Sequence, residues 1–311
     1  MSSLLTNTSA MVALTTLRHI NDDLATTQNR ISTGQRVSDA SDNAAYWSIA
    51  TTMNSDNDAL SAVQDSLGLG AATVDVAFTA MDQSVDVVSE IKSKLVAATA
   101  PGVDRTKIQS DISELQSQLQ TIADSAVFNG ENWLSQDITT TPADAVKTVV
   151  GGFTRDASGN ASIQNISIDT THIALVDTGG NLGILNSEIP EVTAGTNISG
   201  ANMLDFDISA VTDTATDLGH LADVISGVDT KLSKMTDAAT ALGSAKSRID
   251  MQTEFVKNLS DAVDRGVGQL VDADMNAEST RLQALQTQQQ LGIQALSIAN
   301  SGSQNILSLF R

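Results

Sequence analysis

Residues 60–95, LSAVQDSLGLGAATVDVAFTAMDQSVDVVSEIKSKL, place apolar side chains at alternating steps of three and four. The apolar positions are Leu60, Val63, Leu67, Ala71, Val74, Phe78, Met81, Val85, Val88, Ile91 and Leu95. A mean step near 3.5 residues forms a narrow apolar seam along a helix, and such a seam packs against another helix with a left-handed supercoil. The stretch therefore predicts a long helix in a coiled coil or helical bundle.

Two further runs have the same spacing. The first is Ile108, Ile112, Leu115, Leu119 and Ile122, and the second is Leu218, Leu221, Ile225, Val228, Leu232, Met235, Ala239 and Leu242, continuing through Ile249, Val256, Leu259 and Val263. Three runs that can cover one another's apolar faces predict a bundle.

Capping and turn residues between these runs predict where the helices begin and end. Ser41-Asp42 offers a cap for a first helix from about residue 44 to 98, Pro101-Gly102 forces a turn, and Asp104 can cap the returning helix. The third helix, 218–263, comes from the other end of the chain. We therefore expect a discontinuous antiparallel rod formed by both chain ends.

Residues 128–212 have a different pattern. Short β-branched runs surround the turn sequences 156–160 and 177–181, which are rich in Gly, Asn and Asp. This arrangement is typical of hairpins. We expect a small β-containing insertion at 141–210, and a mainly α fold overall.

The two ends carry thinner heptad stripes, interrupted by Gln, Ser and Thr. A single amphipathic helix of this kind is marginal in water, so each end needs the other end, or neighbouring chains, to bury its stripe. The residues expected to form this inner assembly layer are Leu14, Leu17, Leu24, Ile31, Leu282, Leu285, Ile293, Leu296, Ile306 and Phe310.

Composition excludes several classes of function. The net charge of −20 argues against nucleic acid and anionic membranes as partners, and no run of about 18 apolar residues predicts a membrane span. Cysteine is absent, and the three histidines, at 19, 172 and 220, lie in different predicted segments. We expect no catalytic site, no metal site and no cofactor, and hence no enzyme.

Several motifs then indicate a family. Residues 28–45, QNRISTGQRVSDASDNAA, resemble the N-terminal signature of bacterial flagellins, and residues 242–249 and 305–311 resemble the C-terminal side of the same family. Residues 108–130 also match. The stretch 43–50 looks most like flagellins of soil and root-associated alphaproteobacteria.

The resemblance implies an inner domain from residues 1–40 and 268–311, a rod domain from 41–140 and 211–267, and an exposed insertion at 141–210. It also implies a structural subunit that polymerises with itself, and possibly with other flagellins, into the filament used for swimming. Further implied partners are the export chaperone, the cap and the hook-junction proteins. The implied location is the extracellular flagellar filament, reached by type III export without a cleavable signal.

By the same resemblance, host receptors read two parts of a flagellin. The plant receptor reads the stretch matching 28–49 and favours two acidic residues followed by Ala-Ala-Gly, where this chain has Asn43 and Tyr46. The animal receptor reads the rod helix near 90–95, where this chain has Glu90 and Lys94 in place of an Arg and a Leu. We expect weak recognition by both receptors.

Two other functions stay open from the sequence alone. A hook–filament junction protein shares both terminal patterns, and a coiled-coil surface adhesin could use the insertion to bind a glycan. Filament symmetry, co-assembly with other flagellins and glycosylation are not determined by these patterns.

Overall fold

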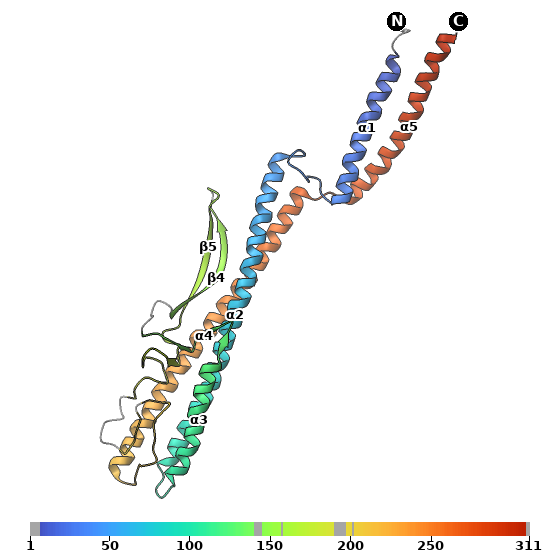
Figure 1. The fold of residues 1–311 in the computed structure, drawn as a ribbon. Helices are drawn as coiled ribbons and strands as arrows, with labels where there is room; N and C mark the ends of the chain where they lie inside the picture. Colours follow the sequence, from blue (N-terminus) through green and yellow to red (C-terminus); the bar gives the residue numbers. More distant parts are fainter. Residues whose placement is uncertain (1–6, 140–144, 157, 190–196, 201, 309–311) are drawn as a thin grey trace. The chain divides into compact units, whose positions relative to one another are not determined.

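The structure is a computed structural model that describes residues 7–139, 145–156, 158–189, 197–200 and 202–308, and the side chains up to residue 302. Its contacts divide the chain into two units, one formed by residues 1–58 and 259–311 and the other by residues 59–258. The mainly α fold with long helices at both chain ends is confirmed (Figure 1). The domain boundaries expected from the sequence are not tested by this division and stay a prediction.

Helices dominate the chain, and short strands lie between the third and fourth helix. The helices are α1 (Thr8–Thr33), α2 (Ala44–Ala98), α3 (Arg105–Ser125), α4 (Ala215–Val271) and α5 (Met275–Ser308). The strands are β1 (Val127–Phe128), β2 (Glu131–Asn132), β3 (Ser135–Gln136), β4 (Val146–Arg155), β5 (Ala161–Asp169) and β6 (Val176–Asp177). None of the described helices is long and apolar enough to cross a membrane.

In the second unit, α2, α3 and α4 share one apolar core at the predicted seam positions. Leu67, Val74, Ile91, Leu119 and Leu242 are all fully buried there. Ion pairs flank the core. Lys92 pairs with Asp229 and Lys246 with Asp75, so α2 and α4 run antiparallel, and Lys94 pairs with Asp111 of α3 at 2.6 Å.

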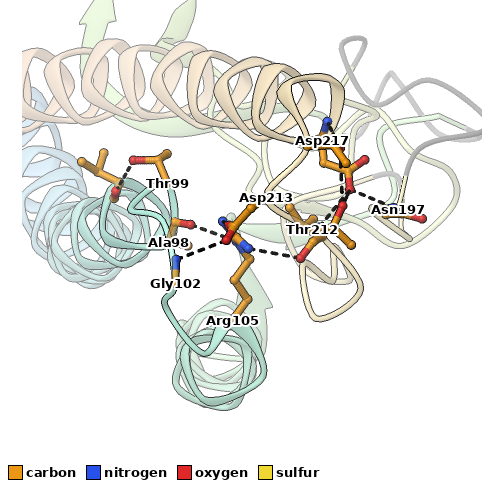
Figure 2. A network of polar contacts seen from close by, with 11 residues as sticks. Ala98, Thr99, Gly102, Arg105, Asn197, Thr212, Asp213 and Asp217 are labelled. Atoms are coloured by element: carbon orange, nitrogen blue, oxygen red, sulfur yellow. Dashed lines mark hydrogen bonds and ion pairs between the residues drawn. The ribbon is translucent and has the colours of Figure 1, made fainter.

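The turn between α2 and α3 is tied to the segment before α4 (Figure 2). The buried Arg105 side chain donates to the carbonyls of Ala98 and Val211 and pairs with Asp213 at 2.7 Å. Asp213 also accepts from the Gly102 amide, at a residue with φ of +77° that favours glycine. One arginine therefore satisfies the last carbonyl of α2 and binds the segment that precedes α4.

Asp217, in the first turn of α4, holds the second half of this network (Figure 2). Its carboxylate accepts from the Thr212 hydroxyl, from the Thr212 amide at 2.9 Å and from the Asn197 amide group at 2.9 Å. These bonds lower the pKa of Asp217 to about 2, the Thr212 hydroxyl having the largest effect.

The strands of the middle segment pack on the rod core. The antiparallel β4–β5 hairpin turns at the predicted loop, where Asp156 accepts from the amides of Ser158 and Asn160. Val149 of β4 lies against Gly70 of α2, where a β-carbon would approach its methyl group to 2.4 Å. Gly70 therefore allows β4 to approach α2 closely, whereas Gly68 faces open space.

The second predicted hairpin, around 177–181, differs in the structure. β6 pairs in parallel with β3, so its partner strand lies before β4 in the chain. The buried Asp177 carboxylate organises the turn instead, because it accepts from the amides of Ile138, Gly179 and Leu182. Local turn residues could not reveal a strand partner about forty residues away.

Candidate assembly surface

The first unit contains an antiparallel pair formed by α1 and α5, which lie alongside each other in Figure 1. Asn7 caps α1 by accepting from the Ala10 amide, and its side chain donates to the Ala299 carbonyl at 3.0 Å. Toward the other end of the pair, Arg30 binds Glu278 at 3.1 Å. The Asn7 and Arg30 side chains, one toward each end of α1, thus fix the register of the pair.

The seam between the two helices is apolar and partly buried. It contains Leu17, Ile20, Leu24, Ile31, Leu282, Leu285 and Leu296. Leu285 is the most deeply buried of these, at 6% exposed. Gly292 allows close approach, since a β-carbon there would lie 3.1 Å from Leu17.

Other apolar side chains of the pair point to solvent. We call Met11, Val12, Leu14, Leu291, Ile293 and Ile298 the outward apolar set. Their exposed fractions range from 38% at Leu14 to 71% at Ile298. A helix that is apolar on more than its packed face is typical of a helix that is buried on several sides.

The predicted assembly residues divide between these two locations. Leu17, Leu24, Ile31, Leu282, Leu285 and Leu296 lie on the seam within the chain, whereas Leu14 and Ile293 belong to the outward apolar set. The side chains of Ile306 and Phe310 lie outside the described residues. Which of these residues contact a neighbouring subunit stays a prediction.

Four members of the outward apolar set are missing from the prediction: Met11, Val12, Leu291 and Ile298. A single heptad template selects one seam per helix and ignores apolar residues on the other sides. Leu291 and Ile298 are seven residues apart, so a search for a second stripe would have found them.

The segments that follow α1 and precede α5 are bound to each other. The Arg36 and Val37 amides donate to the Val271 carbonyl, and the Ala273 amide donates to the Gly34 carbonyl at 2.9 Å. Gly34 ends α1 with φ of +72°. Because the bonds are between backbone atoms, the two connections are held together largely independently of side-chain identity.

The stretch after this connection contains two of the predicted receptor-recognition positions. Asn43 caps α2, since its side-chain oxygen accepts from the amides of Ala45 and Tyr46 at 3.1 and 3.2 Å. Ser41-Asp42 was expected to provide this cap. Asp42 instead accepts from the amides of Ser38 and Asp39, and these bonds lower its pKa. Tyr46 is 41% exposed, and the Arg36 guanidinium lies over its ring, 6.0 Å from the ring centre.

The other two receptor-recognition positions lie on α2 in the second unit. Glu90 is exposed, and Lys94 is ion-paired with Asp111. The hydrogen bond to Asp111 raises the pKa of Lys94, followed in effect by the charges of Asp111 and Glu90. Receptor binding at these four positions stays a prediction.

Family comparisons agree with the pairing of the two chain ends. Residues 4–139 match the family model described as the bacterial flagellin N-terminal helical region, and residues 225–310 match the bacterial flagellin C-terminal helical region. The chain belongs to the bacterial flagellin family. This flagellin is matched at the segments that form α1, α2, α3 and α5 and most of α4.

Relatives along the full length support the same conclusion. Flagellin A of Rhizobium meliloti (strain 1021) is 47% identical, and Flagellin C of that strain is 51% identical, with complete coverage of both chains in each case. A flagellin of Brucella melitensis is 45% identical, again with complete coverage. A crystal structure of Bacillus cereus flagellin aligns at a TM-score of 0.38 and 17% identity over 64% of this chain and 94% of that one.

Family membership confirms the main functional prediction. The chain is a structural subunit of the flagellar filament and not an enzyme, and its resemblance to alphaproteobacterial flagellins is confirmed. Nothing in the comparisons favours the junction protein or the adhesin. Self-polymerisation follows from the family, whereas the individual contacts do not.

Proposed function

We propose that the outward apolar set of the α1–α5 pair is the surface through which this flagellin packs against neighbouring copies in the inner layer of the filament. The observation that carries the proposal is the exposure of six large apolar side chains on two helices whose seam is already filled. Burial of one such side chain contributes about 1.5–3 kcal/mol, so a repeated contact along the polymer stabilises it substantially.

Charge supports the same assignment. Residues 1–50 carry three arginines and four aspartates, and residues 270–311 carry two arginines and three acids, whereas most of the charge of −20 lies between them. Nearly neutral ends can crowd together without strong repulsion, and the acidic middle favours contact with solvent. The contacts would be head-to-tail, because an open helical polymer needs two different faces on each subunit.

Export and assembly would use further partners. By family, the subunit would leave the cell through the type III flagellar channel with the help of an export chaperone, and would be placed in the extracellular filament between the hook-junction proteins and the cap. The marginal terminal helices favour this route, because each depends on the other for its seam and unfolds readily when separated.

Point substitutions can separate the seam from the outward apolar set. Val12→Asp and Ile298→Asp should leave the helix content unchanged by circular dichroism and should abolish filaments in electron micrographs, because an unpaired charge would be buried between chains. Leu285→Asp should instead lower the helix content, since Leu285 packs inside the α1–α5 pair.

Ser233→Asp serves as the matched control. Ser233 is exposed on α4 in the other unit, so this substitution adds the same charge away from the α1–α5 pair. Filaments of normal length and yield from Ile298→Asp would overturn the proposal.

A further inference from the structure

The second unit contains an open groove of about 650 Å³ between α4 and the segment from the end of β5 to residue 187. This volume is within the range of small-molecule sites. The wall on α4 consists of Lys234, Asp237, Ala238, Ala241, Ser244, Ala245 and Arg248. The facing wall includes Asp169, Thr171, His172 and Ser187.

Two cations at the ends of this groove are unusual in the unit. Within its described residues, Lys234, Arg248 and Lys257 are the basic side chains without an ion pair or a hydrogen bond, and two of these three line the groove. In a chain with 37 acidic and 17 basic residues, a basic side chain ordinarily has carboxylates available nearby. Two unpaired cations in one groove indicate an anionic ligand.

The distance between the two cations indicates the length of the ligand that could bind both. Lys234 and Arg248 are fourteen residues apart on one helix, which places their backbones about 21 Å apart along the axis. Small side chains, those of Ala238, Ala241 and Ala245, line the groove between these two cations. A ligand that reaches both cations is therefore elongated and lies along α4.

The other polar side chains of the groove favour a ligand that carries hydroxyl groups. The Asp169 carboxylate already accepts hydrogen bonds from the Thr171 hydroxyl at 2.5 Å and from the Thr171 amide at 2.9 Å. These bonds lower the pKa of Asp169, and the charge of the neighbouring His172 lowers it further. The acidic side chains of Asp169 and Asp237 offer hydrogen-bond acceptors and disfavour a ligand made of carboxylates alone. Ser167 and Ser244 can both donate and accept, whereas the Ser187 hydroxyl already accepts from Lys231 and donates to the Ile184 carbonyl.

We propose that this groove binds a short linear acidic oligosaccharide, whose carboxylates pair with Lys234 and Arg248 and whose hydroxyls donate to Asp169 and Asp237. A ligand with carboxylates alone would leave the two aspartates opposed to like charge, and a neutral sugar would leave the two cations without partners. This binding activity is separate from filament formation, since the groove lies outside the α1–α5 pair.

The test uses the full-length protein and a linear tetramer of galacturonic acid in isothermal titration calorimetry. We expect saturable binding, with maltotetraose and a tetraglutamate peptide each at least tenfold weaker. Lys234→Gln and Arg248→Gln should each weaken binding of the acidic tetramer by roughly tenfold or more, because each removes one charge-assisted hydrogen bond. Lys257→Gln, which removes an unpaired cation of the same helix outside the groove, should leave the affinity unchanged.

Three results would overturn the proposal: no binding of the acidic tetramer at millimolar concentration, equal binding of tetraglutamate, or an equal loss of affinity in Lys257→Gln. Circular dichroism of the variants checks that the fold is intact. Filament formation by the same variants is measured in parallel, so that a failure of sugar binding is distinguishable from a failure of the assembly proposal.

Discussion

Two glycines of α2 that are separated by one residue have opposite surroundings. A β-carbon at Gly70 would lie 2.4 and 2.8 Å from the two methyl groups of Val149, whose β-branched side chain has little freedom to move away, whereas a β-carbon at Gly68 would meet nothing within 4 Å. The same change at the two positions should therefore have opposite effects on stability.

We expect Gly70→Ala to lower the free energy of unfolding by about 1–2 kcal/mol through overpacking, and Gly68→Ala to raise it by about 0.5–1 kcal/mol through helix propensity. Urea denaturation of the unassembled protein measures both. Equal effects of the two substitutions would show that β4 does not rest on α2 at Gly70.

The Asp217 carboxylate makes the free energy of unfolding depend on pH. Its folded pKa of about 2 lies below the ordinary value of 3.8, so its stabilising effect is complete at neutral pH and is lost as the pH falls from about 4 toward 2. We expect Asp217→Asn to lower Tm by a constant amount between pH 7 and 5, and by progressively less below pH 4. A difference in Tm that stays constant down to pH 2 would contradict the role of the Thr212 and Asn197 bonds.

Asn43 and Tyr46 bear on plant recognition, as the family resemblance implies. A peptide of residues 28–49 should trigger little oxidative burst in plant cells, because one favoured carboxylate is replaced by an amide and a Gly by a bulky ring. Restoring Asn43→Asp and Tyr46→Gly should raise the response about ten- to a hundredfold, the range expected for one charge-assisted hydrogen bond. A strong response to the unmodified peptide at nanomolar dose would refute the prediction.

At the scale of elements, α1 and α5 depend on each other, because among the described residues the two helices pack together along their seams. Removal of residues 1–33 or 275–311 should unfold the remaining terminal helix and prevent filament formation, while the long helices α2–α4 keep their circular dichroism signal. Electron microscopy and sedimentation measure assembly. Long filaments from either truncated protein would show that the inner layer does not need the pair.

At the scale of the whole molecule, the middle segment is part of the rod core. Leu175, Leu185 and Phe206 are fully buried in the same cluster as Leu119 and Leu221. If residues 141–210 formed only the exposed insertion expected from the sequence, the whole segment could be removed with the filament retained. The shared core restricts this tolerance to the part of the segment that projects from the core.

Two deletions test this restriction. The described residues of 154–162, at the turn of the β4–β5 hairpin, are all exposed, and removal of 154–162 should leave Tm and filament yield unchanged. Removal of residues 170–210 should lower Tm by more than 10 °C, because it exposes several core side chains, each of which costs about 2–5 kcal/mol when truncated. Equal tolerance of both deletions would show that the rod core is complete without the middle segment.

The sequence by itself determined the helices. Apolar steps near 3.5 extend over long stretches and are local, so the rod seam, the terminal stripes and the turn at Pro101-Gly102 were all readable, and the family motifs agreed with them. The inference that the third rod helix comes from the far end also needed only the rule that apolar faces must be covered.

Only the tertiary structure decided the rest, because it depends on contacts between residues far apart in the chain. The parallel pairing of β3 with β6, the role of Arg105 at the end of the rod and the packing of Val149 on Gly70 have no local signal. The same holds for the division of terminal apolar residues into a seam and an outward set. Burial depends on which neighbour covers each side chain, and periodicity alone does not name that neighbour.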